Sequence, residues 1–209
     1  MEKRRTEIIC GIDEAGRGPL AGPVYAAAVI LGGGFPLNLL NDSKKMTAAS
    51  REEARRVIME KARFWGIGHA SHAEIDSINI LQASLLAMKR AFDDMIERGG
   101  AAFRASPLGE NINSVTAIVD GKFTPVLSAP SCITVHCTAM VKADSKVPEV
   151  MAASILAKTE RDAFMDKMAE QYPQYGYEKH KGYPTKAHRE AVIKYGPSPI
   201  QRLSFKVKI

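Results

Sequence analysis

Two kinds of apolar pattern alternate along this 209-residue chain. Short, nearly uninterrupted apolar runs at residues 8–12, 24–31 and 115–119 predict strands that are buried on both faces. Residues 79–98 instead carry apolar side chains at steps of four and three, the pattern of one helix face. The apolar positions of that predicted helix are Leu81, Leu85, Met88, Phe92 and Met95.

Residues that begin helices mark out the other elements. Thr47 is a typical N-cap for a helix over residues 51–63. Pro148 suits the first turn of a helix over residues 150–171, since its missing N–H is not needed there. Residues 186–195 predict a short last helix, and the remaining strand candidates are residues 64–70 and 133–141. Strands that alternate with helices predict an α/β domain around a mixed sheet.

Composition narrows the class of protein. Hydrophobic residues make up 45% of the chain and charged residues 25%, as in globular proteins. No run approaches the ~20 apolar residues that span a bilayer, and residues 1–6 lack the apolar core of a signal peptide. We therefore expect a cytoplasmic protein without a membrane partner. The net charge of +6 suits a polyanionic partner such as nucleic acid, although it could simply keep the protein soluble.

The cysteines do not indicate a disulfide framework. There are three cysteines, an odd number, and no CxxC pair among them: Cys10, Cys132 and Cys137. His136 beside Cys137 could suggest zinc, but the spacing is wrong and a second ligand pair is missing. Buried, reduced thiols are the favoured interpretation.

Four carboxylates stand where predicted strands end. Asp13 and Glu14 follow the first strand, Asp120 follows the strand over residues 115–119, and Asp144 lies between a strand candidate and a helix. Loops at strand ends are where rigid scaffolds present functional groups. The alternative is that each is only a turn former or a helix cap.

Carboxylates gathered at one place repel one another, and a divalent cation relieves this repulsion. Carboxylate oxygens suit Mg²⁺ or Mn²⁺. Two such ions ~3.5–4 Å apart can activate a water and stabilise the leaving oxygen of a phosphodiester. A basic protein with a focal acidic cluster therefore fits a nuclease.

Other polar segments are candidates for contact with nucleic acid. Gly16 and Gly18 on either side of Arg17 let the backbone approach a ligand closely, although a plain turn would also explain them. Tyr183 lies in a basic loop over residues 178–186, which suits a backbone groove with a stacking platform or else a solvated loop. Candidate phosphate contacts are Ser43, Lys44, Lys45 and Lys146.

These segments together resemble the motifs of ribonuclease HII, the type 2 ribonuclease H. Residues 11–24 (GIDEAGRGPLAGPV) resemble its long opening motif, and residues 42–45 (DSKK) and 119–121 (VDG) resemble the next two. The family's fourth motif is resembled by residues 142–146 together with 152–158. Its C-terminal motifs are resembled by residues 180–183 and 195–202. The resemblance runs in order over nearly the whole chain. Gly-Arg-Gly favours type 2 over type 3, which resembles Gly-Lys-Gly at this place.

The resemblance implies a fold and roles for residues. It implies an RNase H-like catalytic domain over residues 1–171, with a mixed sheet flanked by helices, and a small helical, basic extension over residues 172–209 that packs on it. The metal-binding and catalytic carboxylates would be Asp13, Glu14, Asp120 and Asp144. The segment from Gly16 to Gly18 would contact the 2′-OH and phosphate at a ribonucleotide–deoxyribonucleotide junction, and Tyr183 would sense the next sugar.

The expected activity is metal-dependent hydrolysis of the RNA strand of RNA/DNA hybrids and cutting 5′ to single ribonucleotides in duplex DNA. The products would carry 3′-hydroxyl and 5′-phosphate ends. A duplex-binding module without catalysis is one alternative, and a Mg²⁺-dependent phosphatase of small molecules is another. We expect a monomer, with a sliding clamp as a candidate partner for the tail over residues 203–209.

Two positions depart from the family pattern. Ala143 stands where the pattern has Gly, which would matter only if the backbone there needs a positive φ. Val147 and Pro148 replace a small polar lead into the helix. We therefore expect a shift of the helix start and of the approach of Asp144.

Overall fold

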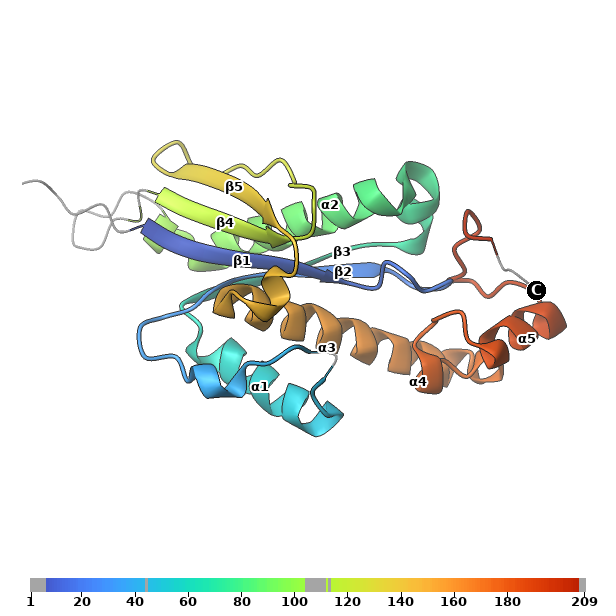
Figure 1. Ribbon diagram of the computed structural model, residues 1–209. Helices are drawn as coiled ribbons and strands as arrows, with labels where there is room; N and C mark the ends of the chain where they lie inside the picture. Colours follow the sequence, from blue (N-terminus) through green and yellow to red (C-terminus); the bar gives the residue numbers. More distant parts are fainter. Residues whose placement is uncertain (1–6, 44, 104–111, 113, 207–209) are drawn as a thin grey trace, which may run out of the picture.

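The computed structural model describes residues 7–43, 45–103, 112 and 114–206. One mixed five-stranded sheet, in the order β3-β2-β1-β4-β5, forms its centre (Figure 1). Its strands are β1 (Glu7–Ala15), β2 (Val24–Ile30), β3 (Phe64–Ala70), β4 (Ser114–Asp120) and β5 (Thr134–Met140). The central strand β1 is antiparallel to β2 and parallel to β4. The predicted α/β architecture is thus confirmed.

Five α-helices accompany the sheet within the described part of the chain. They are α1 (Ala48–Lys61), α2 (His72–Gly99), α3 (Pro148–Gln171), α4 (Tyr177–His180) and α5 (Lys186–Tyr195). Short 3₁₀ helices are η1 (Leu37–Leu39), η2 (Gly100–Phe103), η3 (Ala143–Ser145) and η4 (Pro173–Tyr175). Among the described residues, no helix has the length and apolar character to cross a membrane.

The two faces of the sheet pack against different helices, as Figure 1 shows. Alternate residues of β2 divide between them, because successive side chains of a strand point to opposite faces. Ala26 and Ala28 pack with α2, whereas Ala27 and Val29 pack with α1 and α3. The apolar run predicted for a doubly covered strand follows from this arrangement.

The close fit of α3 to β1 depends on Gly11. A Cβ at Gly11 would lie 2.1 Å from the backbone carbon of Glu149, in the first turn of α3. Because the obstacle is backbone, a side chain at this position would push α3 away from the sheet. Gly11 therefore brings the start of α3, and η3 just before it, close to the central strand.

Several element boundaries differ from the sequence-based expectation. Strand β1 does not end at Ile12 but continues through Asp13 and Glu14 to Ala15. The predicted helix over residues 79–98 is the longer part of α2, which begins at His72. Asn79 interrupts α2 with a φ of 66°, and its Oδ1 accepts hydrogen bonds from the amides of Leu81 and Gln82. Asn79 therefore caps the helix that the pattern predicted.

Three further expectations concern the second half of the chain. The helix over residues 186–195 is confirmed, and α3 begins at Pro148 as that residue predicted. The loop predicted after residue 171 instead contains η4 and α4. All three cysteines are free, but only Cys10 is buried, and the exposed Cys132 contradicts the interpretation of buried thiols.

Candidate active site

The sheet register sets Asp13 beside Asp120. Strands β1 and β4 run parallel with Ile12 opposite Val119, so the next residue of each strand lies at the same level. Asp13 shares the face of Gly11, two residues earlier, and therefore points toward α3. Two carboxylates from strands far apart in the sequence thus lie side by side at the carboxyl ends of β1 and β4.

The third carboxylate arrives through η3. The amide N–H of Ala143 donates to Oδ1 of Asp120 at 2.7 Å, which ties this turn to the end of β4. The left-handed residue of the turn is Lys142, with a φ of 60°, and Ala143 is not among the residues of positive φ. The methyl group of Ala143 therefore costs the turn no backbone strain, and Asp144 follows directly.

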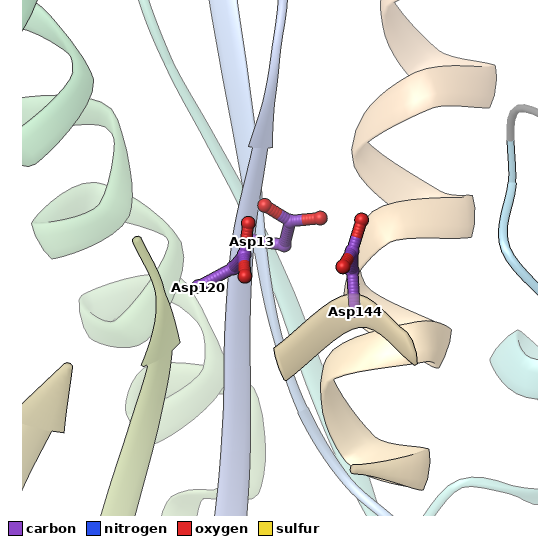
Figure 2. A group of neighbouring side chains, drawn as sticks. All are labelled: Asp13, Asp120 and Asp144. Atoms are coloured by element: carbon purple, nitrogen blue, oxygen red, sulfur yellow. The ribbon is translucent and has the colours of Figure 1, made fainter. Parts of the chain in front are cut away.

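Asp13, Asp120 and Asp144 form the carboxylate cluster: one oxygen from each of the three side chains lies within 4.8 Å of the other two. Figure 2 shows the three side chains converging from β1, β4 and η3. Burial raises the pKa of Asp13 well above its ordinary value, and the charges of Glu14 and Asp120 raise it further. Asp13 is buried, and Asp120 and Asp144 are partly buried. Mutually repelling oxygens gathered in this way fit a divalent cation, which would supply the missing positive charge.

Glu14 lies beside the carboxylate cluster but outside it. Its Oε1 pairs with the guanidinium of Arg17 at 3.4 Å, and its Oε2 is buried without a hydrogen-bond partner. Burial raises the pKa of Glu14, an effect that Arg17 opposes and Asp120 reinforces. A buried, unpartnered carboxylate oxygen costs free energy, so Oε2 is available to a cation or to a water held by one.

Two serines form a hydrogen-bonded chain that leads to Asp13. A hydrogen bond from Ser154 of α3 lowers the pKa of Asp13 against the dominant effect of burial. The hydroxyl of Ser154 also lies 2.8 Å from that of Ser43. Either hydroxyl can be the donor in this pair. Ser43 is buried in this arrangement rather than displayed on the surface.

A cavity of about 210 Å³ opens beside these groups. Its lining combines acidic, backbone-rich and aromatic segments: Asp13, Glu14, Ala15, Gly16, Arg17, Gly18, Ser43, Ser154, Lys158 and Tyr183. The structure thus brings together most of the predicted site residues. Lys45 is exposed beside Asp42, and Lys146 is exposed away from the cavity lining. The predicted contact at Lys44 lies outside the described residues.

Comparison with known proteins agrees with this geometry. The family model of ribonuclease HII matches residues 10–208. The chain belongs to the ribonuclease HII family. A ribonuclease HII of Treponema denticola is 52% identical over 96% of this chain and 99% of its own length. One of Polynucleobacter asymbioticus is 48% identical over 94% of this chain and 92% of its own.

Solved structures confirm the fold. Ribonuclease H2 of Pyrococcus horikoshii superposes with a TM-score of 0.66 at 23% identity, covering 96% of this chain and 94% of that one. The ribonuclease HII in a complex with PCNA from Archaeoglobus fulgidus gives 0.69 at 24% identity, covering 97% and 96%. Enzymes of the ribonuclease HII family are metal-dependent ribonucleases H, and this chain is therefore a ribonuclease H.

Sequence reasoning missed several residues of this ribonuclease HII site. Ser154 and Lys158 lie on α3 and line the cavity. The ammonium of Lys158 is held by Asp162 one turn later, at 2.7 Å. Their i, i+4 spacing is visible in the sequence, but an ordinary surface pair on a helix has the same spacing. Two buried arginines, Arg161 and Arg202, were also missed.

Proposed function

We propose that this ribonuclease H cuts on the 5′ side of single ribonucleotides in duplex DNA, and hydrolyses the RNA strand of RNA/DNA hybrids. The observation that carries this proposal is the cavity that both Asp13 and the segment from Gly16 to Gly18 line. One wall can hold the cations that are required for the attack of a water on a phosphodiester. The other can contact a ribose at the same phosphate.

In this proposal the carboxylate cluster, with Glu14 beside it, holds two Mg²⁺ or Mn²⁺ ions. When bound, the ions activate a water and stabilise the departing 3′-oxygen. Asp13, oriented by Ser154, supplies an oxygen ligand from the sheet, and Asp144 supplies one from η3. The pairing of Arg17 with Glu14 brings a positive charge to the same cavity, where it suits a substrate phosphate.

Recognition of the ribose rests on the opposite wall. A Cβ at Gly18 would lie 3.6 Å from Cε1 of Tyr183, so the tyrosine ring stands directly beside the glycine backbone. Tyr183 is 42% exposed, which leaves part of its side chain available to a sugar. We propose that the backbone of Gly16 to Gly18 contacts the 2′-OH and phosphate, while Tyr183 packs on the next sugar. A 2′-OH on that sugar would crowd the ring.

The direct test is cleavage of a DNA duplex that carries one ribonucleotide. We expect one cut on its 5′ side with Mn²⁺ or Mg²⁺, 3′-hydroxyl and 5′-phosphate ends, and no cut with EDTA. An all-DNA duplex of the same sequence is the control. Binding without cleavage in either metal, or equal cleavage of both duplexes, would contradict the proposal.

Three lesser expectations remain proposals. The division of the chain near residue 172 is a proposed boundary between a catalytic domain and an extension. The tail over residues 203–209 is a candidate site for a sliding clamp, and the 74% exposure of Leu203 supports an exposed contact there. A cytoplasmic monomer is expected, which fractionation and sedimentation would check.

A further inference from the structure

The segment between β1 and β2 is held by one buried side chain from near the end of the chain. Arg202 is fully buried. A guanidinium has five N–H donors in a rigid plane, and Arg202 directs its nitrogens at five carbonyl oxygens of residues 16–23. Nε donates to Gly22 at 2.8 Å, Nη1 to Arg17 at 3.1 Å and Pro19 at 2.8 Å, and Nη2 to Gly16 at 2.6 Å and Pro23 at 3.2 Å.

The direction of these carbonyls fixes the direction of the neighbouring amides. In a trans peptide, the carbonyl of one residue and the N–H of the next point to opposite sides, and none of the described peptide bonds is cis. Because the carbonyls of Gly16 and Arg17 face Arg202, the N–H groups of Arg17 and Gly18 face away from it. Both residues line the cavity on their other side.

A second buried arginine supports the same segment. Arg161 of α3 donates from Nε to the carbonyl of Pro23 at 3.1 Å and from Nη2 to that of Ala21 at 3.2 Å. Burial and the charge of Arg161 lower the pKa of Arg202 to about 9, so Arg202 is still charged at neutral pH. Two buried cations beside one loop are unfavourable for folding, and such costs concentrate at functional sites.

The backbone around Arg202 is also fixed. Its own N–H donates to the carbonyl of Leu20 at 2.8 Å. The two residues that follow are anchored to α2, because the carboxylate of Asp76 accepts hydrogen bonds from the amides of Leu203 and Ser204. The backbone of Arg202 and of the two residues after it is therefore fixed, and this fixes the position from which the guanidinium reaches the loop.

We propose that Arg202 is a positioning residue that sets the ribose selectivity of this enzyme. Its planar fork holds the carbonyls of Gly16 and Arg17, and this presents the next two amides to the 2′-OH and phosphate of the ribonucleotide. The proposal rests on the proposed function. Under this proposal the C-terminal segment takes part in substrate recognition through the loop that it positions, without contacting the substrate itself.

The test compares Arg202→Lys with Tyr177→Phe. Lysine keeps the charge but loses the five-donor fork. Tyr177→Phe removes the buried 2.6 Å hydrogen bond to Ser198, and so destabilises the same segment without touching the loop. The measured quantity is ribose preference, the ratio of Kd for an all-DNA duplex to Kd for the matched duplex with one ribonucleotide. Both variants are made in an Asp144→Asn background, where the duplex stays whole, and Mn²⁺ affinity is titrated separately with Asp144 intact.

Arg202→Lys should lower ribose preference about tenfold, the value of one hydrogen bond, and raise KM for the single-ribonucleotide duplex. Mn²⁺ affinity should change by less than about twofold, since the carboxylate cluster is untouched. Tyr177→Phe should lower Tm and leave ribose preference unchanged. A folded Arg202→Lys protein with wild-type preference overturns the proposal, as does an equal loss in Tyr177→Phe.

If Arg202→Lys does not fold, ribose preference is measured in Asp76→Ala instead, and that result tests the proposal. This substitution releases the exposed anchor behind Arg202 and should lower ribose preference by a smaller factor; an unchanged preference overturns the proposal. Failure of the proposed function gives a different result, because the parent enzyme would then show no ribose preference and no cut at the ribonucleotide.

Discussion

Asp13 of the carboxylate cluster and the segment from Gly16 to Gly18 line the same cavity, but the cluster and the segment are built in opposite ways. The cluster joins side chains from two adjacent strands and one short turn, and the sheet register alone brings Asp13 and Asp120 together. The glycine segment belongs to a loop whose backbone is held by distant arginines: Arg202 bonds the carbonyls of Gly16 and Arg17, and Arg161 bonds those of Ala21 and Pro23. The cation-holding side chains are therefore positioned by the sheet and η3, whereas the loop that we propose to recognise the ribose is positioned by buried arginines of α3 and of the C-terminal segment.

Removing a carboxylate should have the largest effect. Asp13→Asn and Asp144→Asn should each lower the cleavage rate by at least about 10³-fold, because metal stabilisation is worth several kcal/mol and each 1.4 kcal/mol is tenfold. Single-turnover cleavage of the chimeric duplex at saturating Mg²⁺ measures this. If the two regions are separable, binding of the ribonucleotide duplex persists. Near-wild-type cleavage by both variants would refute the metal-site assignment.

A methyl group should break the glycine loop at one position and be tolerated at another. At Gly16 a Cβ would lie 2.1 Å from Nε of Arg161, and φ is 104°. At Gly18 its nearest neighbour would be Tyr183, at 3.6 Å. Gly16→Ala should therefore lower the free energy of unfolding by about 2–4 kcal/mol, and Gly18→Ala by much less. Thermal unfolding of both variants checks this, and equal losses would disprove the tight packing around Gly16.

The pH dependence of stability should report on the carboxylate cluster. The raised pKa of Asp13 means that the folded protein holds a proton which the unfolded chain loses near pH 3.9. The free energy of unfolding of the metal-free protein should therefore fall as pH rises from about 4 through the folded pKa. Asp13→Asn should reduce this fall and raise the melting temperature of the metal-free protein at pH 7.

Thermal melts in EDTA between pH 4 and 8 measure this effect. Asp93→Asn is a matched control, since Asp93 pairs with Lys89 on the surface of α2. A wild-type melting temperature with the same pH slope as Asp13→Asn would contradict the raised pKa.

Lys158 should give the smallest effect. Its ammonium lines the cavity and is held by Asp162. If it contacts a substrate phosphate, Lys158→Ala should reduce the slope of log K against log salt by about 1. Lys89→Ala, which removes a lysine of a surface ion pair on α2 outside the cavity lining, is the control. An unchanged slope for Lys158→Ala would leave Lys158 as a structural partner of Asp162 alone.

The same contrast explains how much could be predicted from sequence. Asp13 and Asp120 could be found because each stands at the end of an apolar run, and parallel strands bring such ends together. The start of α2 was also within reach, since Ser71 and Glu74 form a capping box that is visible as Ser-x-x-Glu.

Other features are set by long-range packing. Arg202 meets Gly16 across 186 residues, and although it closes the motif over residues 195–202, nothing local in the sequence shows which backbone its side chain contacts. The contact of Ser43 with α3 also could not be predicted, because nothing local shows that its hydroxyl would lie against that of Ser154. The role of Ser43 as a phosphate contact stays a prediction. Glu14 is predicted as a metal ligand and stays so: the pleat places its Oε1 beside Arg17, while its Oε2 is buried without a hydrogen-bond partner next to the cluster.

The separation of cutting from selection is the central claim, and ribose preference in Asp144→Asn tests it most directly. The ratio of Kd for an all-DNA duplex to Kd for the matched single-ribonucleotide duplex should stay at least tenfold in this variant, although it no longer cuts. A ratio near one, with the loop and Arg202 intact, would contradict the claim and make the carboxylate cluster itself the source of selectivity.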